Sequence, residues 1–174
     1  MTSDSPSSSA TPAARPFILT RTFNAPRDLV FRAWTDPEYL KHWWGPKGVT
    51  VTLCNMDLRP GGRFHYCMHT QDGVEIWGRW IFREITPPER LVFVSSFSNL
   101  EGGISRHPMS PTWPAELLST ITFATDGAQT TVTIHWIPLN PSEVERQTFD
   151  AAHDSMRMGW GGSFDGLEAY LAKL

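Results

Sequence analysis

After Gly48, hydrophobic and polar residues alternate with a period of two for roughly ninety residues. This pattern predicts a meander of antiparallel strands rather than alternating strands and helices. A first strand is expected earlier, at residues 17–23, where Arg21 falls on the more aromatic side. Between them, Ala25-Pro26 is expected to open one short helix, and Thr35-Asp36-Pro37-Glu38 to end it and cap a second.

Two turn signals predict strand registers. A turn at Arg59-Pro60-Gly61-Gly62 places Cys54 opposite Cys67, and it places Leu53 on the same face as Phe64, Tyr66 and Met68. Asp126-Gly127 is the strongest hairpin signal in the chain and places Ile121 opposite Val132.

The last stretch, residues 140–174, predicts one long helix that packs across the sheet. Asn140 is expected to cap it, with Pro141 in the first turn and Glu143 completing a capping box. An apolar stripe recurs mostly every four residues, at Val144, Thr148, Ala152, Met156, Trp160, Phe164, Leu167 and Leu171. Glycines at 159, 161 and 162 cost helix stability, so close packing or a kink is expected there.

The segment from Ser98 to Ala115 is a long interruption of the meander. Loops of this length are often functional, and Gly102-Gly103 would give it mobility, with Met109 and Trp113 as apolar contacts. It is therefore expected to cover the mouth of a cavity. An insertion without a role is the alternative, because long loops cost little stability.

Composition narrows the class of protein. The formal net charge is −3 without a basic cluster, which argues against nucleic-acid binding. No apolar run suits a membrane span or a secretory signal, so a cytoplasmic protein is expected. Residues 1–15, rich in Ser, Pro, Thr and Ala, are predicted to be a disordered tail, and residues 16–174 a single domain.

Metal and cofactor binding are not predicted. His65 and His69 lie four apart on one strand, roughly 13 Å at about 3.3 Å per residue, too far for one ion. Cys54 and Cys67 are expected to be free thiols in a reducing compartment.

Several motifs carry a family resemblance. They are Thr20-Arg21-Thr22-Phe23-Asn24-Ala25-Pro26, Val30-Phe31-Arg32-Ala33-Trp34-Thr35-Asp36-Pro37, Trp43-Trp44-Gly45-Pro46, Asp57-Leu58-Arg59-Pro60-Gly61-Gly62-Arg63-Phe64 and Ile85-Thr86-Pro87-Pro88-Glu89-Arg90-Leu91. From about Pro16 to Leu174 the chain resembles the heat-shock-protein-90 ATPase activator-homologue family, within the START-like (SRPBCC) superfamily.

The resemblance implies an α+β helix-grip fold. A seven-stranded curved antiparallel sheet would surround a long C-terminal helix, with two short helices after the first strand. It also implies a cavity that holds hydrophobic or aromatic molecules in relatives. True chaperone activators carry a further N-terminal domain in the place of residues 1–15, so a chaperone partner is not expected here.

We therefore predict binding of a small hydrophobic molecule, as a carrier or sensor. The expected lining comprises Trp43, Trp44, Phe64, Tyr66, Met68, Trp80, Phe93, Phe97, Ile121, Trp136, Met156 and Trp160. A homodimer is left open, and so are two other functions. The first is a cyclase-like or hydrolase-like enzyme, using Arg21, Glu75, Arg79, His135 or Tyr66 if they point inward, although no catalytic set is readable. The second is an interaction module, which would need a filled core and an exposed apolar patch.

Overall fold

The computed structural model describes residues 13–174, so most of the predicted tail lies outside it. The strands are β1 (Phe17–Phe23), β2 (Thr50–Met56), β3 (Arg63–His69), β4 (Glu75–Thr86), β5 (Arg90–Ser98), β6 (Ile104–Ser105), β7 (Leu117–Asp126) and β8 (Gln129–Pro138). The helices are α1 (Arg27–Thr35), α2 (Pro37–Leu40), α3 (Glu143–Ala151) and α4 (His153–Leu171). The main sheet runs β1-β8-β7-β5-β4-β3-β2, all antiparallel, and β6 adds a short pairing to β5. The predicted α+β helix-grip fold is confirmed, with β6 as an additional strand.

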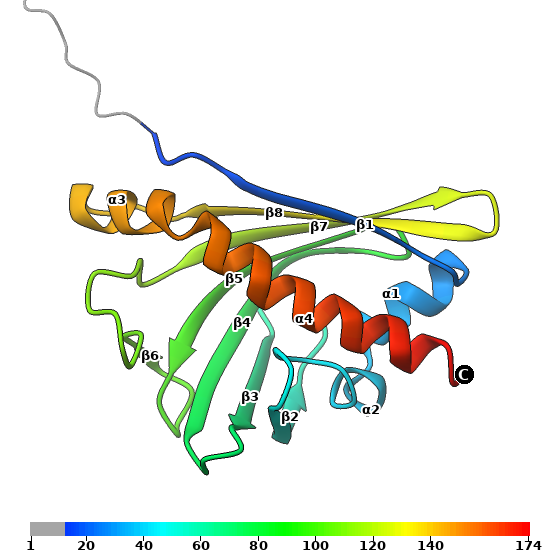
Figure 1. Ribbon diagram of the computed structural model, residues 1–174, viewed down its shortest axis with the longest axis horizontal. Helices are drawn as coiled ribbons and strands as arrows, with labels where there is room; N and C mark the ends of the chain where they lie inside the picture. Colours follow the sequence, from blue (N-terminus) through cyan, green and yellow to red (C-terminus); the bar gives the residue numbers. More distant parts are fainter. Residues whose placement is uncertain (1–12) are drawn as a thin grey trace, which may run out of the picture.

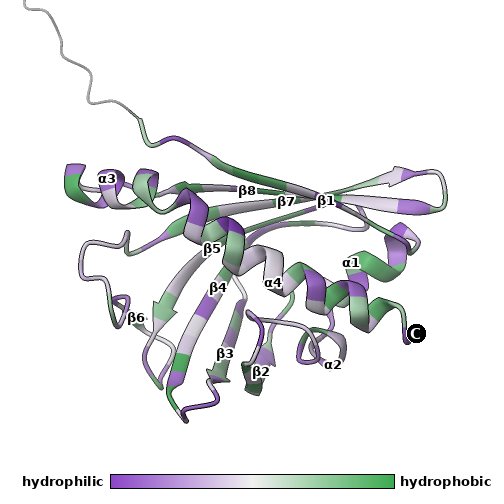
Figure 2. Cartoon of the chain, viewed as in Figure 1, coloured by the Kyte–Doolittle hydropathy of each residue, from purple (hydrophilic) through white to green (hydrophobic). Residues whose placement is uncertain are grey.

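The sheet bends strongly, and α4 runs diagonally across its concave face (Figure 1). Helices α1 and α2 lie at one end of the sheet, and α3 lies at the other. Hydrophilic and hydrophobic residues succeed one another along β4 in Figure 2, as expected for a strand with two different faces. The core between sheet and helices includes Trp34, Trp80 and Phe164, each nearly or fully buried.

Strand β1 explains the unusual position of Arg21. Its guanidinium Nη1 lies 2.7 Å from a carboxylate oxygen of Asp165 on α4. Its charged end also lies 5.5 Å from the ring centre of Phe164. Arg21 thus fastens the first strand to the last helix and does not enter the core. Arg15, just before β1, also contacts the C-terminal region, because its backbone N–H donates to a carboxylate oxygen of Asp150 at 2.8 Å.

The predicted single C-terminal helix is two helices with a later start. Ser142, not Asn140, caps α3, and Ser142 and Glu145 exchange the two hydrogen bonds of a capping box. Asn140 adopts a positive φ of 44°, which belongs to the turn before the helix. Ala152 separates α3 from α4, and the stripe shifts across this break: Phe149 is buried, whereas Val144 is 51% exposed. A continuous 3.6-residue period assumes a single helix, so it could not predict that the buried face changes at Ala152.

The β7–β8 hairpin has the predicted faces but a register two residues away from the prediction. Gly127 and Ala128 form the loop, because Asp126 pairs with Gln129 and Gly127 takes the positive φ, 61°. Ile121 therefore lies opposite Ile134 instead of Val132. A shift of two keeps each side chain on its face, so Ile121 and Val132 are both fully buried.

Strand β2 contains a β-bulge between Val51 and Leu53 that the sequence reading missed. Leu53, not Cys54, pairs with Cys67, and Cys54 pairs with Tyr66. Because the extra residue reverses the faces beyond it, Cys54 points toward the helix side and Cys67 away from it. Both thiols are free, as predicted, and burial raises the pKa of the Cys54 thiol to about 11.

The capping box offers a test of the helix start. Ser142→Ala removes the acceptor for the Glu145 N–H and should lower the free energy of unfolding by about 1 kcal/mol. Ser142→Asp keeps an acceptor at that position and should retain most of the stability. Denaturant unfolding measures both variants; equal stability of Ser142→Ala and the parent protein would contradict the assigned cap.

Candidate ligand-binding pocket

A pocket of about 520 Å³ lies between the concave face of the sheet and the C-terminal helices. The sheet contributes Tyr66, Met68, Trp80, Phe93, Ser95, Ser96, Phe97, Leu117 and Trp136, and the segment after α2 contributes Trp44, Gly45 and Pro46. The helices and the residue between them contribute Thr148, Ala152, Ser155, Met156, Gly159, Trp160 and Ser163. The segment between β6 and β7 contributes His107, Ser110, Trp113 and Pro114. The wall is thus mainly aromatic, with small hydroxyl groups between the rings.

Most of the predicted lining residues lie on this wall, and the exceptions form a layer behind it. Trp43 is buried and donates its indole N–H to the Ala33 carbonyl at 2.9 Å. Phe64 is fully buried, with its ring centre 5.0 Å from that of Tyr66. Ile121 is also fully buried and does not reach the pocket. These residues support the wall rather than form its surface.

Trp160 is the centre of the aromatic wall. Its ring centre lies 5.4 Å from those of Trp44 and Trp136, at steep angles, and 5.9 Å from that of Trp34. The edge-to-face arrangement is favourable for aromatic rings and restricts their rotation. Helix α4 and strand β8 are therefore joined by aromatic contacts on one side of the pocket.

A glycine on β4 gives Tyr66 its place in the wall. Gly78 is the cross-strand partner of Tyr66, and a Cβ built on Gly78 would lie 2.3 Å from the phenol oxygen. The Tyr66 ring therefore lies directly over the glycine backbone. Burial raises the pKa of Tyr66, against the opposite effect of the neighbouring Trp44 indole. Its hydroxyl stays protonated under ordinary conditions.

Close packing explains some of the helical glycines. A Cβ on Gly162 would lie 3.4 Å from the backbone of Lys47, and one on Gly166 would lie 3.3 Å from the Trp43 carbonyl. Gly159 and Gly161 have open space around a built Cβ, and only Gly159 lines the pocket. Close approach therefore accounts for Gly162 and Gly166, and α4 continues through the whole cluster.

The segment between β6 and β7 supplies a polar wall residue that the sequence analysis missed. His107 stacks edge-on against Phe97 at 4.7 Å, and its Nδ1 accepts the Met109 N–H at 3.0 Å. The neutral ring therefore carries its proton on Nε2, which is left as a donor. Burial holds the pKa of His107 below its usual value. No sequence pattern distinguished this histidine, because its inward direction depends on the loop conformation.

This segment is fastened to α3. Arg106 Nη1 lies 2.9 Å from Glu145 and 3.2 Å from the Trp113 carbonyl oxygen, and Thr148 donates to Thr112 at 2.8 Å. Trp113 lines the pocket as expected, but Met109 is 89% exposed. The segment thus forms one wall of the pocket and is latched to a neighbouring helix.

The residues considered for catalysis do not gather in the pocket. Arg21 pairs with Asp165, and Glu75, Arg79 and His135 do not line the wall. Among the described residues, Tyr66 and His107 are the titratable groups on the wall. Ser95 and Ser119 share a hydrogen bond of 3.3 Å, without a base beside either hydroxyl in the described part of the chain.

The curved sheet, the C-terminal helix and the pocket between them define a helix-grip domain of the START-like class. The sequence model of the family "Activator of Hsp90 ATPase homolog 1-like protein" matches residues 24–172. The chain therefore belongs to this family.

Solved structures agree with the assignment. A solution structure from Arthrobacter aurescens has a TM-score of 0.76 and 26% identity, covering 92% of this chain and 88% of that one. A crystal structure from Nitrosomonas europaea has a TM-score of 0.70 and 26% identity, covering 91% and 94%. An AHSA1 protein from Silicibacter pomeroyi, at 19% identity and a TM-score of 0.68, covers 91% and 98% and shows the fold alone. The comparison with curated proteins finds no match. Within residues 13–174, no helix is both long and apolar enough to cross a membrane.

The close approach of Tyr66 and Gly78 gives a stability test. Gly78→Ala places a methyl group against the phenol and should lower the free energy of unfolding by about 1–3 kcal/mol through overpacking. Gly161→Ala is the control, because open space surrounds that position and alanine favours a helix, so stability should rise slightly. Equal stability of Gly78→Ala and the parent protein, measured by denaturant unfolding, would show that Tyr66 does not lie over the glycine.

Proposed function

We propose that this protein binds a small, mainly apolar molecule with an aromatic or extended hydrophobic part, as a carrier or sensor. The observation that carries the proposal is the aromatic wall around a space of about 520 Å³. This volume falls within the usual range for small-molecule sites, and the family fold supports ligand binding in general.

The energetics favour an apolar guest. Removing about 300 Å² of apolar ligand surface from water contributes roughly 7.5 kcal/mol at about 25 cal/mol per Å². Association costs at least about 4 kcal/mol in lost freedom, so at most about 3.5 kcal/mol of net gain remains, and polar groups of the guest left without partners would reduce it further. A rigid wall helps, because few of its side chains need to be ordered on binding.

The polar groups of the wall indicate where such partners are. Nε2 of His107 is a donor in the neutral ring, and the hydroxyl groups of Ser110 and Ser155 belong to residues that also line the pocket. A guest with one or two acceptor atoms, such as a carbonyl or ether oxygen, would satisfy donors of this kind. The proposed ligand is therefore apolar in bulk with a small number of acceptors.

The alternatives have less support. Catalysis would need a cluster of ionisable groups, whereas Tyr66 stays protonated and His107 stands without a hydrogen-bonded acid or nucleophile in the described residues. An interaction module would be expected to fill its core, and here the space against α4 is open. Native mass spectrometry of the purified protein tests the proposal directly. A co-purified small molecule that denaturation releases supports it.

Filling the pocket should weaken ligand binding. Gly159→Phe puts a ring at a pocket-lining position with open space, and should weaken the binding of the uncharged fluorescent probe N-phenyl-1-naphthylamine at least about tenfold, roughly 1.4 kcal/mol. Gly161→Phe is the matched control, because Gly161 has similar open space but does not line the pocket. Equal probe affinity in the two variants would argue against this pocket as the binding site.

Binding should also weaken in acid. Because burial lowers the pKa of His107, the folded protein binds fewer protons than the unfolded chain between that pKa and 6.5. The free energy of unfolding therefore decreases as the pH falls through that window. The positive charge on the His107 ring also disfavours an apolar ligand beside it. Probe affinity should fall as the pH drops through the pKa of His107, which lies below 6.5, in the parent protein and in the control His135→Gln. It should stay flatter in His107→Gln; an unchanged pH profile in that variant would exclude His107 as the cause.

A further inference from the structure

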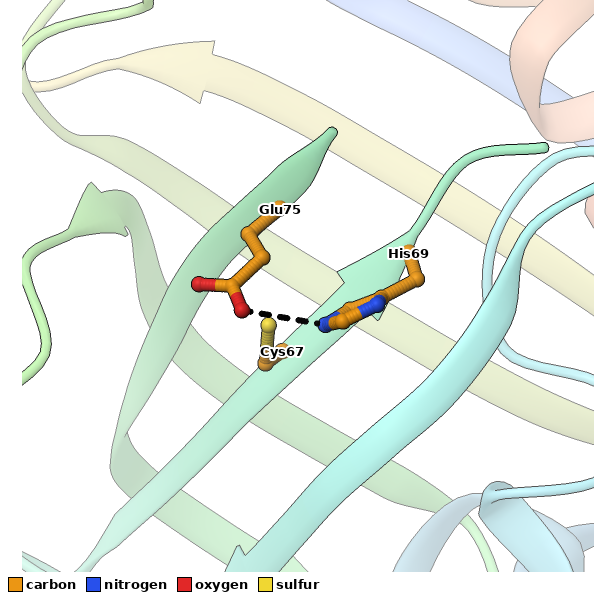
Figure 3. A group of neighbouring side chains, drawn as sticks. All are labelled: Cys67, His69 and Glu75. Atoms are coloured by element: carbon orange, nitrogen blue, oxygen red, sulfur yellow. Dashed lines mark ion pairs between the residues drawn. The ribbon is translucent and has the colours of Figure 1, made fainter. Parts of the chain in front are cut away.

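Three potential metal ligands meet on the convex face of the sheet, away from the pocket. His69 on β3 pairs directly with Glu75 on β4, and Cys67 lies two residues before His69 on the same face. The Cys67 Sγ, a ring nitrogen of His69 and a carboxylate oxygen of Glu75 all lie within 4.8 Å of one another. Figure 3 shows the three side chains directed toward a common point. The sequence analysis compared histidines along one strand, so it missed this arrangement across two strands.

The carboxylate is already oriented toward this point. Glu75 Oε1 lies 3.3 Å from His69 Nε2, and its other oxygen accepts the Trp77 indole N–H at 3.1 Å. A hydrogen bond to the second oxygen of a carboxylate is typical of the outer shell of metal sites, where it fixes the ligand. Trp77 is also the cross-strand partner of Cys67, so it flanks both the thiol and the carboxylate.

The exposure of the three residues suits entry of an ion from solvent. Cys67 is only 1% exposed, whereas the side chains of His69 and Glu75 are 37% and 50% exposed. The Cys67 thiol thus lies at the buried end of the group, and the side chains of His69 and Glu75 lie at its solvent-exposed end.

We propose that Cys67, His69 and Glu75 form a binding site for a borderline-soft divalent cation of the zinc type. Tetrahedral zinc with bonds of about 2.0–2.3 Å requires ligand atoms roughly 3.3–3.8 Å apart, so the groups need to draw together by at most about 1–1.5 Å. The thiolate and imidazole disfavour calcium and magnesium, which take oxygen ligands. Three protein ligands leave a fourth position for water or an external group.

The site is separate from the pocket but shares its strand. Tyr66 and Met68 alternate with Cys67 and His69 along β3, and they line the pocket on the opposite face. A bound ion would fasten β3 to β4 directly behind that wall. The proposal does not depend on what the pocket binds.

The test uses tag-free, reduced protein titrated with Co²⁺ and then with Zn²⁺. Cobalt should bind at one ion per chain, give an intense thiolate-to-cobalt charge-transfer absorption, and be displaced by zinc. Isothermal calorimetry then measures zinc affinity. His69→Gln and Glu75→Gln should each weaken it by more than the 10–100-fold that loss of an outer-shell partner costs.

Matched variants distinguish this site from non-specific metal binding. Cys67→Ser should abolish the charge-transfer band, whereas Cys54→Ser, which changes the other thiol, should keep it. His135→Gln should retain zinc affinity. Absence of the band in the parent protein, its persistence in Cys67→Ser, or unchanged zinc affinity in both His69→Gln and Glu75→Gln would overturn the proposal. If Cys67→Ser does not fold, the surface variants His69→Gln and Glu75→Gln decide the question. Unchanged zinc affinity in both would mean that His69 and Glu75 form only a cross-strand ion pair.

Discussion

The packing of a straight helix against a strongly curved sheet is the constraint on which this structure depends. A helix touches a concave surface along a limited line, so space remains where the sheet bends away from it. Toward the C-terminal end of α4, Phe164 and Leu167 close that space and are fully buried. Nearer its start, the small residues Ala152, Ser155 and Gly159 face the pocket, and the lining of α4 ends with Trp160 and Ser163. The pocket therefore follows from the small residues at Ala152 and along the first two turns of α4, combined with large aromatic rings on the sheet.

The elements and much of the wall were predictable because they depend on local rules. Strand β1, the two short helices and the meander follow directly from hydrophobic periodicity and from Pro and Gly positions. Alternation along β3 assigned Tyr66 and Met68 to the concave face, and the helical stripe assigned Met156 and Trp160 to the same space. Trp43, Phe64 and Ile121 were assigned to the correct side but to the wrong depth. Periodicity gives the direction of a side chain, whereas depth depends on what lies in front of it.

The remaining differences arise where a single residue changes the phase of a pattern. The bulge in β2 reverses the faces of Leu53 and Cys54, whose similar hydrophobicity gives the sequence pattern no preference. The break at Ala152 exchanges Val144 for Phe149 on the buried side. The inward direction of His107 depends on hydrogen bonds within its loop and on the latch from Arg106 to Glu145, which join residues far apart in the chain. Local patterns carry little information about such contacts.

The two faces of β3 join the candidate sites into one mechanical unit. Consecutive residues of a strand point to opposite faces, so a shift of the backbone at Cys67 moves the neighbouring Tyr66 and Met68 as well. Tyr66 has little freedom to adjust independently, because its ring lies over Gly78 and stacks on Phe64. A shift of the β3 backbone at Cys67 would therefore also move the backbone that carries the two pocket-lining side chains, Tyr66 and Met68. The glycine at position 78 allows this tight contact, because any side chain there would collide with the Tyr66 ring.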